Sequence, residues 1–490
     1  MCSIEEEIQT GDAETPSIRS RRRLVVEGLC HKCKQSPPVV DMKRVMYCKT
    51  CFKESVVYRF RGNLMRATKI ADGAKALVAF SGGASSRLLL HLLSEFHEPD
   101  PSNLRKKRKF SDVLICHVDQ SAVLGGEDKE AEVRRIGEKS GFPYLHIPLE
   151  SIFSNDDGSD GGALVPVGFD LADTVTLKMV HRVTSTLSPV ARLRRSIHGL
   201  GKMTAKEDLL HHFTMRALLN TARKEGCNVL ILGDNATRMA IRILALTSKG
   251  GGFGLPIEVA GDTDWFEGLV VARPLRDVLS KEVAVYNQYT DLDTVVMPAL
   301  TTAMPAKSSI DRMTEEFLVG LQRDFPMTVN TVVRTAAKVT SEHRAKTVMR
   351  CPMCGGPIQD GTNDWRSGHT VSQLLSHAPS SDTTSEALSS TSNTHPCSTS
   401  CACAPTVNPE STSTSCCTPA DQPINIIPYL CYPCQNICRD AQEFGATAAK
   451  KGIDDATVIL PAYVGEEITM RKGREWMKKE IEEFLIDEED

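Results

Sequence analysis

The sequence predicts an α/β protein, a doubly wound parallel sheet flanked by N- and C-terminal cysteine-rich zinc modules. Three observations carry this prediction. Apolar runs of strand length alternate with amphipathic helical patterns. One of these strands passes into its helix through a Gly-Gly turn, and pairs of Cys-x-x-Cys motifs stand on both sides of the region. A chain of 490 residues is long enough for a large core and about three domains.

The strand–turn–helix unit is the centre of the prediction. Residues 76–80 form an apolar run, Ser81-Gly82-Gly83 follows, and leucines then recur at helical spacing, which predicts a helix over 84–96. At such a turn, backbone N–H groups without partners point together, and the helix dipole favours an anion there. A tight turn with no ligand is the alternative interpretation.

The remaining elements follow from the same patterns. Strands are predicted at 112–118, 142–149 and 227–232, and helices at 127–140, 170–195, 208–224 and 466–490. Asp119 ends the second strand beside the first, a position that suits the nucleotide crevice of a doubly wound sheet.

Charge gives only a local indication of nucleic-acid binding. The chain has 58 Lys and Arg against 62 Asp and Glu, so any such contact must come from a patch. The helix predicted at 170–195 becomes basic toward its end. We therefore take Arg192, Arg194, Arg195 and Lys202 as candidates for contact with a nucleic acid, which the resemblance described below would make a tRNA. A solvated surface helix is the alternative.

Cysteine spacing predicts two metal sites. Cys30, Cys33, Cys48 and Cys51 form two knuckles 14 residues apart, a spacing typical of a closed, structural Zn²⁺ site with four thiolates. A second set has 76 residues between its knuckles and comprises Cys351, Cys354, Cys431 and Cys434. Cys438 is a possible substitute ligand, and unliganded cysteines are the alternative at both sites. A secretory signal is not evident, which favours a reducing compartment and metal over disulfides.

Composition sets the predicted boundaries. They are a disordered tail at 1–24, a four-cysteine module at 25–60, an α/β domain at 61–345, a second cysteine module at 346–440 and a C-terminal segment with a charged helix at 441–490. The Ser/Thr-rich stretch at about 357–425 cannot bury enough apolar surface to order itself. No run of 18 apolar residues occurs, so no membrane anchor is expected.

The Gly-Gly turn resembles the PP-loop of ATP pyrophosphatases, whose pattern is SGGxDS. Ser81, Gly82, Gly83 and Ser86 match, whereas Ser85 stands at the aspartate of the family. Later, GDNATR is similar to the GHNADD of tRNA-thiolating members, with Thr237 and Arg238 replacing the acidic pair. The resemblance implies a cofactor site made of these residues: Ser81, Gly82, Gly83, Ser85, Ser86, Asp119, Gly233 and Asn235.

Together with the paired cysteines and RPLRDV, these motifs resemble the cytoplasmic tRNA 2-thiolation protein 2 family over most of 25–350 and 425–465. The resemblance implies a cytoplasmic, heterodimeric partner of a catalytic thiolase subunit. That complex forms 2-thiouridine at the wobble position of tRNA for Lys, Glu and Gln, taking sulfur from a thiocarboxylated ubiquitin-related modifier. Structural zinc is implied, with ATP and Mg²⁺ as an open question.

The positions at which active members carry sulfur-handling cysteines have none here, in 200–226 or in 273–300. We therefore expect a degenerate subunit that is not catalytic alone. Two alternatives remain. One is a self-sufficient ATP-dependent tRNA sulfurtransferase using Cys116 or Cys227, and the other is a zinc-dependent interaction protein without a role on RNA.

Overall fold

The computed structural model describes residues 28–42, 44–97, 109–125, 129–154, 163–169, 175–179, 187–302, 304–339, 348–362, 424–450 and 458–482. The chain forms two compact units, residues 1–58 and 59–490. The first unit contains an antiparallel hairpin of β1 (Val40–Met42) and β2 (Val45–Tyr47). Helix α1 (Lys49–Arg66) begins in this unit, directly after Cys48.

The second unit contains a six-stranded sheet in the order β5-β4-β3-β8-β10-β9. Its strands are β3 (Ala74–Ala79), β4 (Phe110–Asp119), β5 (Tyr144–Pro148), β8 (Val229–Ile231), β9 (Asp262–Phe266) and β10 (Leu269–Ala272). All neighbours are parallel except β9, which pairs antiparallel with β10. The chain builds outward from β3 to β5 and then returns to add β8 on the other side of β3. Strand order therefore reverses between β3 and β8.

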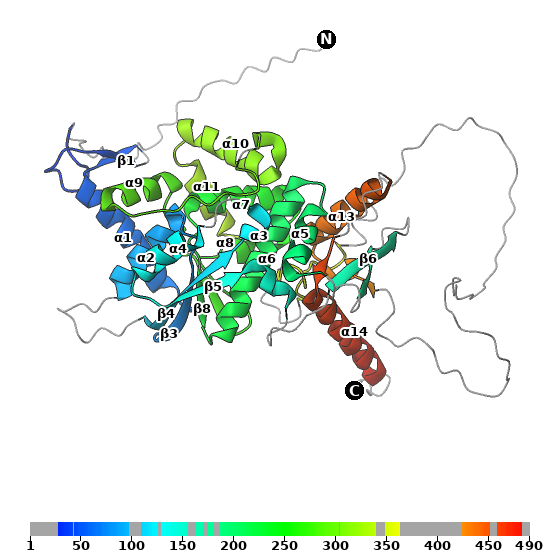
Figure 1. The fold of residues 1–490 in the computed structure, drawn as a ribbon. Coiled ribbons are helices and arrows are strands. Elements are labelled where there is room, and N and C mark those ends of the chain that lie inside the picture. Colours follow the sequence, from blue (N-terminus) through cyan, green and yellow to red (C-terminus); the bar gives the residue numbers. More distant parts are fainter. Residues whose placement is uncertain are drawn as a thin grey trace, which may run out of the picture. The chain divides into compact units, whose positions relative to one another are not determined.

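Helices cover both faces of this sheet, as Figure 1 shows. Ile115 and Cys116 are neighbours in β4 and point to opposite faces. Ile115 packs with side chains of α2 (Ala84–His97) and α4 (Glu130–Glu138), whereas Cys116 packs with those of α6 (Met203–Lys224). The predicted doubly wound α/β class is confirmed.

A smaller antiparallel sheet and further helices complete the second unit. The small sheet has the order β11-β7-β6-β12 and consists of β6 (Ala163–Phe169), β7 (Val175–Met179), β11 (Ile424–Asn425) and β12 (Leu460–Pro461). The other helices are α3 (Ser121–Leu124), α5 (Pro189–His198), α7 (Ala236–Ser248), α8 (Leu255–Val259), α9 (Ser280–Thr290), α10 (Ile310–Asp324), α11 (Thr328–Ala336), α13 (Tyr432–Lys450) and α14 (Ala462–Glu482).

One predicted element is wrong. Within the described part of 170–195, where a helix was expected, Val175–Met179 is a strand paired with β6 and α5 begins at Pro189. The β-branched residues of the strand favour extended backbone. Ser188 then caps α5 by accepting the N–H of Ala191, and Pro189 takes the first helical position. The predicted tail at 1–24 and most of the 357–425 insert lie outside the described residues.

None of the described helices is long and apolar enough to cross a bilayer.

Helix α6 contributes Phe213 to a buried apolar cluster of the second unit. Phe213 is fully buried and its ring lies 6.1 Å from that of Phe153. We expect Phe213→Ala to lower the free energy of unfolding by about 3–5 kcal/mol, because the cavity left behind cannot close. Urea unfolding of the full chain measures this. The control is Phe325→Ala, since Phe325 is 63% exposed. Equal effects of the two substitutions would contradict the packing described.

Candidate functional site

A cavity of about 850 Å³ opens at the carboxyl ends of β3 and β8. Its walls come from the turn after β3, the loop between β8 and α7, and helices α6, α7 and α10. Strand order reverses at this edge of the sheet. Ligands of open α/β sheets bind at such a point, so the cavity is the candidate functional site.

The turn that begins α2 has the geometry of an anion cradle. Gly82 has φ of +77°, and a Cβ there would lie 3.0 Å from Val133. Ser81 is exposed and its Oγ lies 3.2 Å from that of Ser86. In the described part of the chain, the N–H groups of the first turn of α2 (Ala84, Ser85 and Ser86) have no hydrogen-bond acceptor. They are available to an anion.

Asn235 ties this turn to two further helices. Its Oδ1 accepts hydrogen bonds from the N–H of Arg238 (2.9 Å) and from Ser280 Oγ (3.0 Å). Its Nδ2 donates to Ser85 Oγ at 2.8 Å. Arg238 and Ser280 lie in the first turns of α7 and α9. The positive ends of three helices therefore converge at Asn235.

Gly233 allows the two turns to approach. A Cβ at this position would lie 3.2 Å from Ser86 Cα, which is backbone and cannot rotate away. Glycine at the end of β8 thus permits the contact between the cradle and the start of α7.

The positions at which the sequence departs from the PP-loop pattern lie together here. Ser85 is bound to Asn235, and Thr237 Oγ1 accepts the N–H of Ser280 at 3.1 Å. The Arg238 side chain is exposed and makes no hydrogen bond or ion pair with the described residues. Neutral groups and one positive charge therefore occupy places where carboxylates were expected in an active member.

Asp119 ends β4 beside β3, as predicted, but it does not line the cavity. It accepts hydrogen bonds from Ser121 N (2.8 Å) and Ser121 Oγ (2.9 Å) at the start of α3. Asp119 and Gly82 are not among the residues that line the cavity, whereas the other six predicted cofactor residues are.

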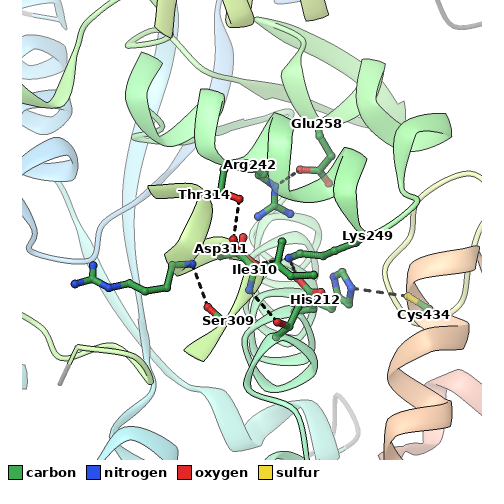
Figure 2. Close-up of polar contacts among 12 residues, drawn as sticks. His212, Arg242, Lys249, Glu258, Ser309, Ile310, Asp311, Thr314 and Cys434 are labelled. Carbon is green, nitrogen blue, oxygen red and sulfur yellow. Dashed lines mark hydrogen bonds and ion pairs between the residues drawn. The ribbon is translucent and has the colours of Figure 1, made fainter. Parts of the chain in front are cut away.

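Carboxylates in the cavity wall are already engaged by cations. Asp234 lies 3.4 Å from Arg273, Glu258 accepts from Arg242 at 2.8 Å, and Glu315 accepts from Arg312 at 2.7 Å. Figure 2 shows Arg242 directed at Glu258 and Lys249 beside Asp311. Glu207 is the exception, since among the described residues it accepts only from the hydroxyl of Thr301, at 2.8 Å.

Burial and neighbouring charges determine the protonation states of Arg242 and His211 in the cavity wall. Burial opposes the charge on Arg242, but Glu258 and Asp234 outweigh it and raise the pKa of Arg242. Burial lowers the pKa of His211 well below 6.5, and the charge of Arg242 adds to this effect. His211, which lines the cavity, is therefore a neutral hydrogen-bonding group at physiological pH.

Helix α10 forms a wall of the cavity that the sequence patterns did not assign to the site. Asp311, Arg312 and Glu315 of α10 face the cavity from a part of the chain some 230 residues after the cradle. Ser309 caps α10 through Arg312 N, so the start of this helix had a local signal. Its position over the cavity depends on long-range contacts such as Ile310 N to Thr204 Oγ1 at 3.0 Å.

The first four-cysteine group lies within the first unit. The sulfur atoms of Cys30, Cys33, Cys48 and Cys51 are within 4.8 Å of one another. Burial opposes ionisation, but backbone N–H groups of Cys33 and Cys48 lower the pKa of Cys30 to about 6. Cys51 lies in the first turn of α1, and burial together with the neighbouring cysteines raises its pKa to about 12 in the absence of a metal. The group has the donors and the compactness of a structural metal site.

The second four-cysteine group lies within the second unit and closes across the long insert. Cys351, Cys354, Cys431 and Cys434 bring their sulfurs within 4.8 Å, and those of Cys354 and Cys431 are 3.5 Å apart. Cys434 lies in the first turn of α13, as Cys51 does in α1. His212 of α6 has Nε2 3.8 Å from Cys434 Sγ, a contact visible in Figure 2. Cys438 is buried and lies outside the group.

Two other described cysteines are buried thiols. Cys116 lines the cavity, and burial raises its pKa to about 12. Burial also raises the pKa of Cys227. Neither side chain is a ready thiolate at neutral pH.

The basic face predicted on α5 requires correction. Arg192 is 2% exposed, because its side of the helix packs inward with Leu193 and Ser196. Arg194 is exposed, but its Nε donates to the carbonyl of Ala122 at 2.7 Å. Lys202 forms ion pairs with Glu443 (3.0 Å) and Asp440 (3.8 Å). Arg195 is half-buried. The four residues do not form one continuous exposed surface.

Loss of the Asn235 side chain should loosen the site. We expect Asn235→Ala to lower the free energy of unfolding by about 1–3 kcal/mol, because it removes the α7 cap and leaves Ser85 and Ser280 without their partner. Ser248→Ala is the control, since the Ser248 hydroxyl is at the exposed end of the same helix. An Asn235→Ala protein as stable as the control would show that the hydrogen bonds of Asn235 contribute little to the free energy of unfolding.

Comparisons with known proteins find similar sequences that share one name. A family model described as cytoplasmic tRNA 2-thiolation protein 2 matches residues 309–436. Proteins with that name are similar along the whole chain. The protein from Homo sapiens is 29% identical over 535 residues and the one from Danio rerio is 26% identical over 529 residues. These alignments cover 100% of this chain, with 99% and 100% of the relatives.

Among solved structures, the U34-tRNA thiolase NcsA from Methanococcus maripaludis with its [4Fe-4S] cluster is similar at 16% identity and a TM-score of 0.47. The match covers 67% of this chain and 96% of that one. An NMN synthetase from Francisella tularensis gives 10% identity, a TM-score of 0.32 and coverage of 60% and 98%. The family model and the full-length relatives confirm the resemblance found in the sequence, and over its full length the chain is similar to the proteins named cytoplasmic tRNA 2-thiolation protein 2.

Proposed function

We propose that this chain is a subunit of the cytoplasmic complex that places sulfur on the wobble uridine of tRNA, and that it does not perform the transfer alone. The full-length relatives support the pathway. The state of the cavity supports the non-catalytic role. The observation that carries the proposal is a phosphate cradle whose expected carboxylate positions hold Ser85, Thr237 and Arg238.

A nucleotide phosphate fits this cradle. The N–H groups at the start of α2 and the Arg238 guanidinium would hold it, together with Ser81, Gly83, Ser85, Ser86, Gly233 and Asn235. Mg²⁺ fits less well, because carboxylates of the wall are paired with arginines or lysine, apart from Glu207. Bound ATP would supply an adenylyl group, with pyrophosphate as the leaving group, as in PP-loop enzymes. The residues here suit binding of the phosphates more than transfer of the adenylyl group.

Sulfur transfer needs a thiolate, and the described cysteines do not offer one in the cavity. Burial keeps Cys116 as a thiol. In each four-cysteine group the four sulfur atoms are gathered around one point. A catalytic partner subunit would therefore supply the nucleophile and receive sulfur from the ubiquitin-related carrier. This chain would support that partner and the tRNA.

We assign Zn²⁺ to both four-cysteine groups. Four thiolates in a closed arrangement match the preference of Zn²⁺ for tetrahedral sulfur ligands, with no open position for chemistry. The metal would be structural at both sites.

The alternative sulfurtransferase would use Cys116, because this cysteine alone among the described ones lines the cavity. It would also need a way to ionise a thiol whose pKa is raised to about 12. The third candidate is a zinc-dependent interaction protein that leaves tRNA thiolation unaffected.

Reconstitution separates the three candidates. The purified chain is incubated with unmodified tRNA, ATP, Mg²⁺ and the thiocarboxylated carrier, alone and with the catalytic subunit, and 2-thiouridine is measured by mass spectrometry. We expect no product from the chain alone and product from the pair, with Cys116→Ala unchanged. Product from the chain alone, lost in Cys116→Ala, would establish the sulfurtransferase. Equal product with and without this chain would leave only the interaction protein.

The metal content of the purified chain tests the assignment of Zn²⁺ to the second four-cysteine group. We expect two Zn²⁺ per chain, falling to one in Cys351→Ser, which leaves three thiolates at the second site. The thermal midpoint should fall as well, since α6, α13 and the knuckles lose their common anchor. Cys227→Ser, a buried cysteine outside both groups, is the control and should keep two ions. Equal metal content in the two variants would contradict the assignment.

A further inference from the structure

We propose that the tRNA backbone is bound on a surface formed by α6, α14 and the segment before the second cysteine group, and not on α5. We call it the α6–α14 basic surface and define it by Arg216, Arg223, Arg350 and Arg471. This inference rests on the proposed role in tRNA thiolation and assigns a position to the RNA.

Helices α6 and α14 meet through a charge cluster with too few acids. Arg216 Nη2 lies 2.9 Å from Glu467 Oε1, and Arg471 Nη2 lies 3.6 Å from Glu467 Oε2. One carboxylate thus serves two guanidinium groups. Arg216 Nε and Arg471 Nη1 are buried and have no acceptor among the residues that the structure describes. The Arg216 and Arg471 side chains are 25% and 19% exposed, so an additional anion can approach this excess of positive charge from solvent.

The same side of α6 carries a further arginine two turns on. Arg223 is exposed, and in the described ranges its guanidinium has no hydrogen bond or ion pair. Partial burial lowers the pKa of Arg223, and the positive charges of Arg216 and Arg350 lower it further. The three arginines are therefore close enough to repel one another, a cost that a bound polyanion would remove.

Aromatic rings support two of these cations. The Arg216 guanidinium lies 4.3 Å from the centroid of Tyr463, and that of Arg350 lies 5.1 Å from Trp265. Arg350 is paired with Glu267, whose side chain is 84% exposed, so solvent screens this pair. Stacked rings restrict planar guanidinium groups that can bind phosphate in a bidentate manner.

RNA is the partner that this chemistry favours. The cluster consists of arginines, which suit phosphate oxygens better than lysines do, and it combines them with aromatic side chains as RNA-binding surfaces do. The arginines predicted on α5 lack these properties, since Arg192 is 2% exposed and Arg194 donates its Nε to the carbonyl of Ala122.

Binding of unmodified tRNA by the full chain, alone and with the catalytic subunit, tests the proposal by fluorescence anisotropy over a range of salt concentrations. We expect Arg223→Gln to weaken binding about fivefold at 0.1 M salt, and the pair Arg223→Gln/Arg350→Gln about 25-fold. The slope of log Kobs against log salt concentration should fall by about 0.7–0.9 for each cation removed. Arg223→Glu should weaken binding more than Arg223→Gln does.

Arg323→Gln is the matched control, because Arg323 is an exposed arginine of α10 without an ion pair among the described residues. Thermal midpoint and metal content are measured for each variant, since Arg350 precedes a cysteine of the second group. Glutamine keeps most of the length of the side chain, Arg223 is exposed and Arg350 is half-buried.

Each outcome has one meaning. Weakened binding with a reduced salt slope, and an unchanged control, supports the surface. The double variant binding tRNA as the unaltered chain does would overturn the surface and leave the proposed function standing. Polyglutamate competing as well as RNA would assign the surface to an acidic protein. An unaltered chain that binds no tRNA, even with its partner, would overturn the proposed function itself.

Discussion

The structure of the site depends on the side-chain amide of Asn235. This buried group caps α7, holds Ser280 at the start of α9 and donates to Ser85 in the cradle. The amide can do this because it is donor and acceptor at once, and a carboxylate at this position could not donate to Ser85. Three helix N-termini are thereby fixed around one opening. The positive potential there comes from backbone geometry as well as from Arg238.

The second cysteine group is joined to the same framework. A Cβ on Gly250, just after α7, would lie 2.6 Å from the ring of Tyr432, so the knuckle packs directly against the end of that helix. Trp265 Nε1 donates to the carbonyl of Gly355 at 2.7 Å, which links the β9–β10 hairpin to the other knuckle. His212 adds the contact with α6. A metal at this site would therefore stabilise elements that also form the cavity.

Local patterns in the sequence identified much of this. The Ser-Gly-Gly turn, the strands around it and both cysteine groups follow from short-range rules, because glycine conformation, helical periodicity and thiolate spacing are local properties. Closure of the second group across 76 residues is consistent with the slow rise of loop entropy with length. The strand at Val175–Met179 was missed although its partner β6 directly precedes it, because five residues of apolar and polar alternation were included in a longer helical interpretation.

Long-range packing decided what could not be predicted. Whether Arg192 faces solvent depends on which side of α5 meets the core, and the same holds for Asp119, whose carboxylate is used at the start of α3. The α10 wall and the cluster around Glu467 join segments far apart in sequence. Such clusters have no signal in any one segment, because each arginine looks like an ordinary surface residue until its neighbours are known.

The central claim is that the cavity retains phosphate binding after losing the groups that hold Mg²⁺. Calorimetric titration of the full chain with ATP, with Mg²⁺ and with excess EDTA, tests it most directly, with Gly233→Val as the variant that blocks the cradle. We expect binding of similar affinity in both conditions, its loss in Gly233→Val, and no conversion of ATP to AMP. Binding that requires Mg²⁺ and proceeds to AMP and pyrophosphate would contradict it.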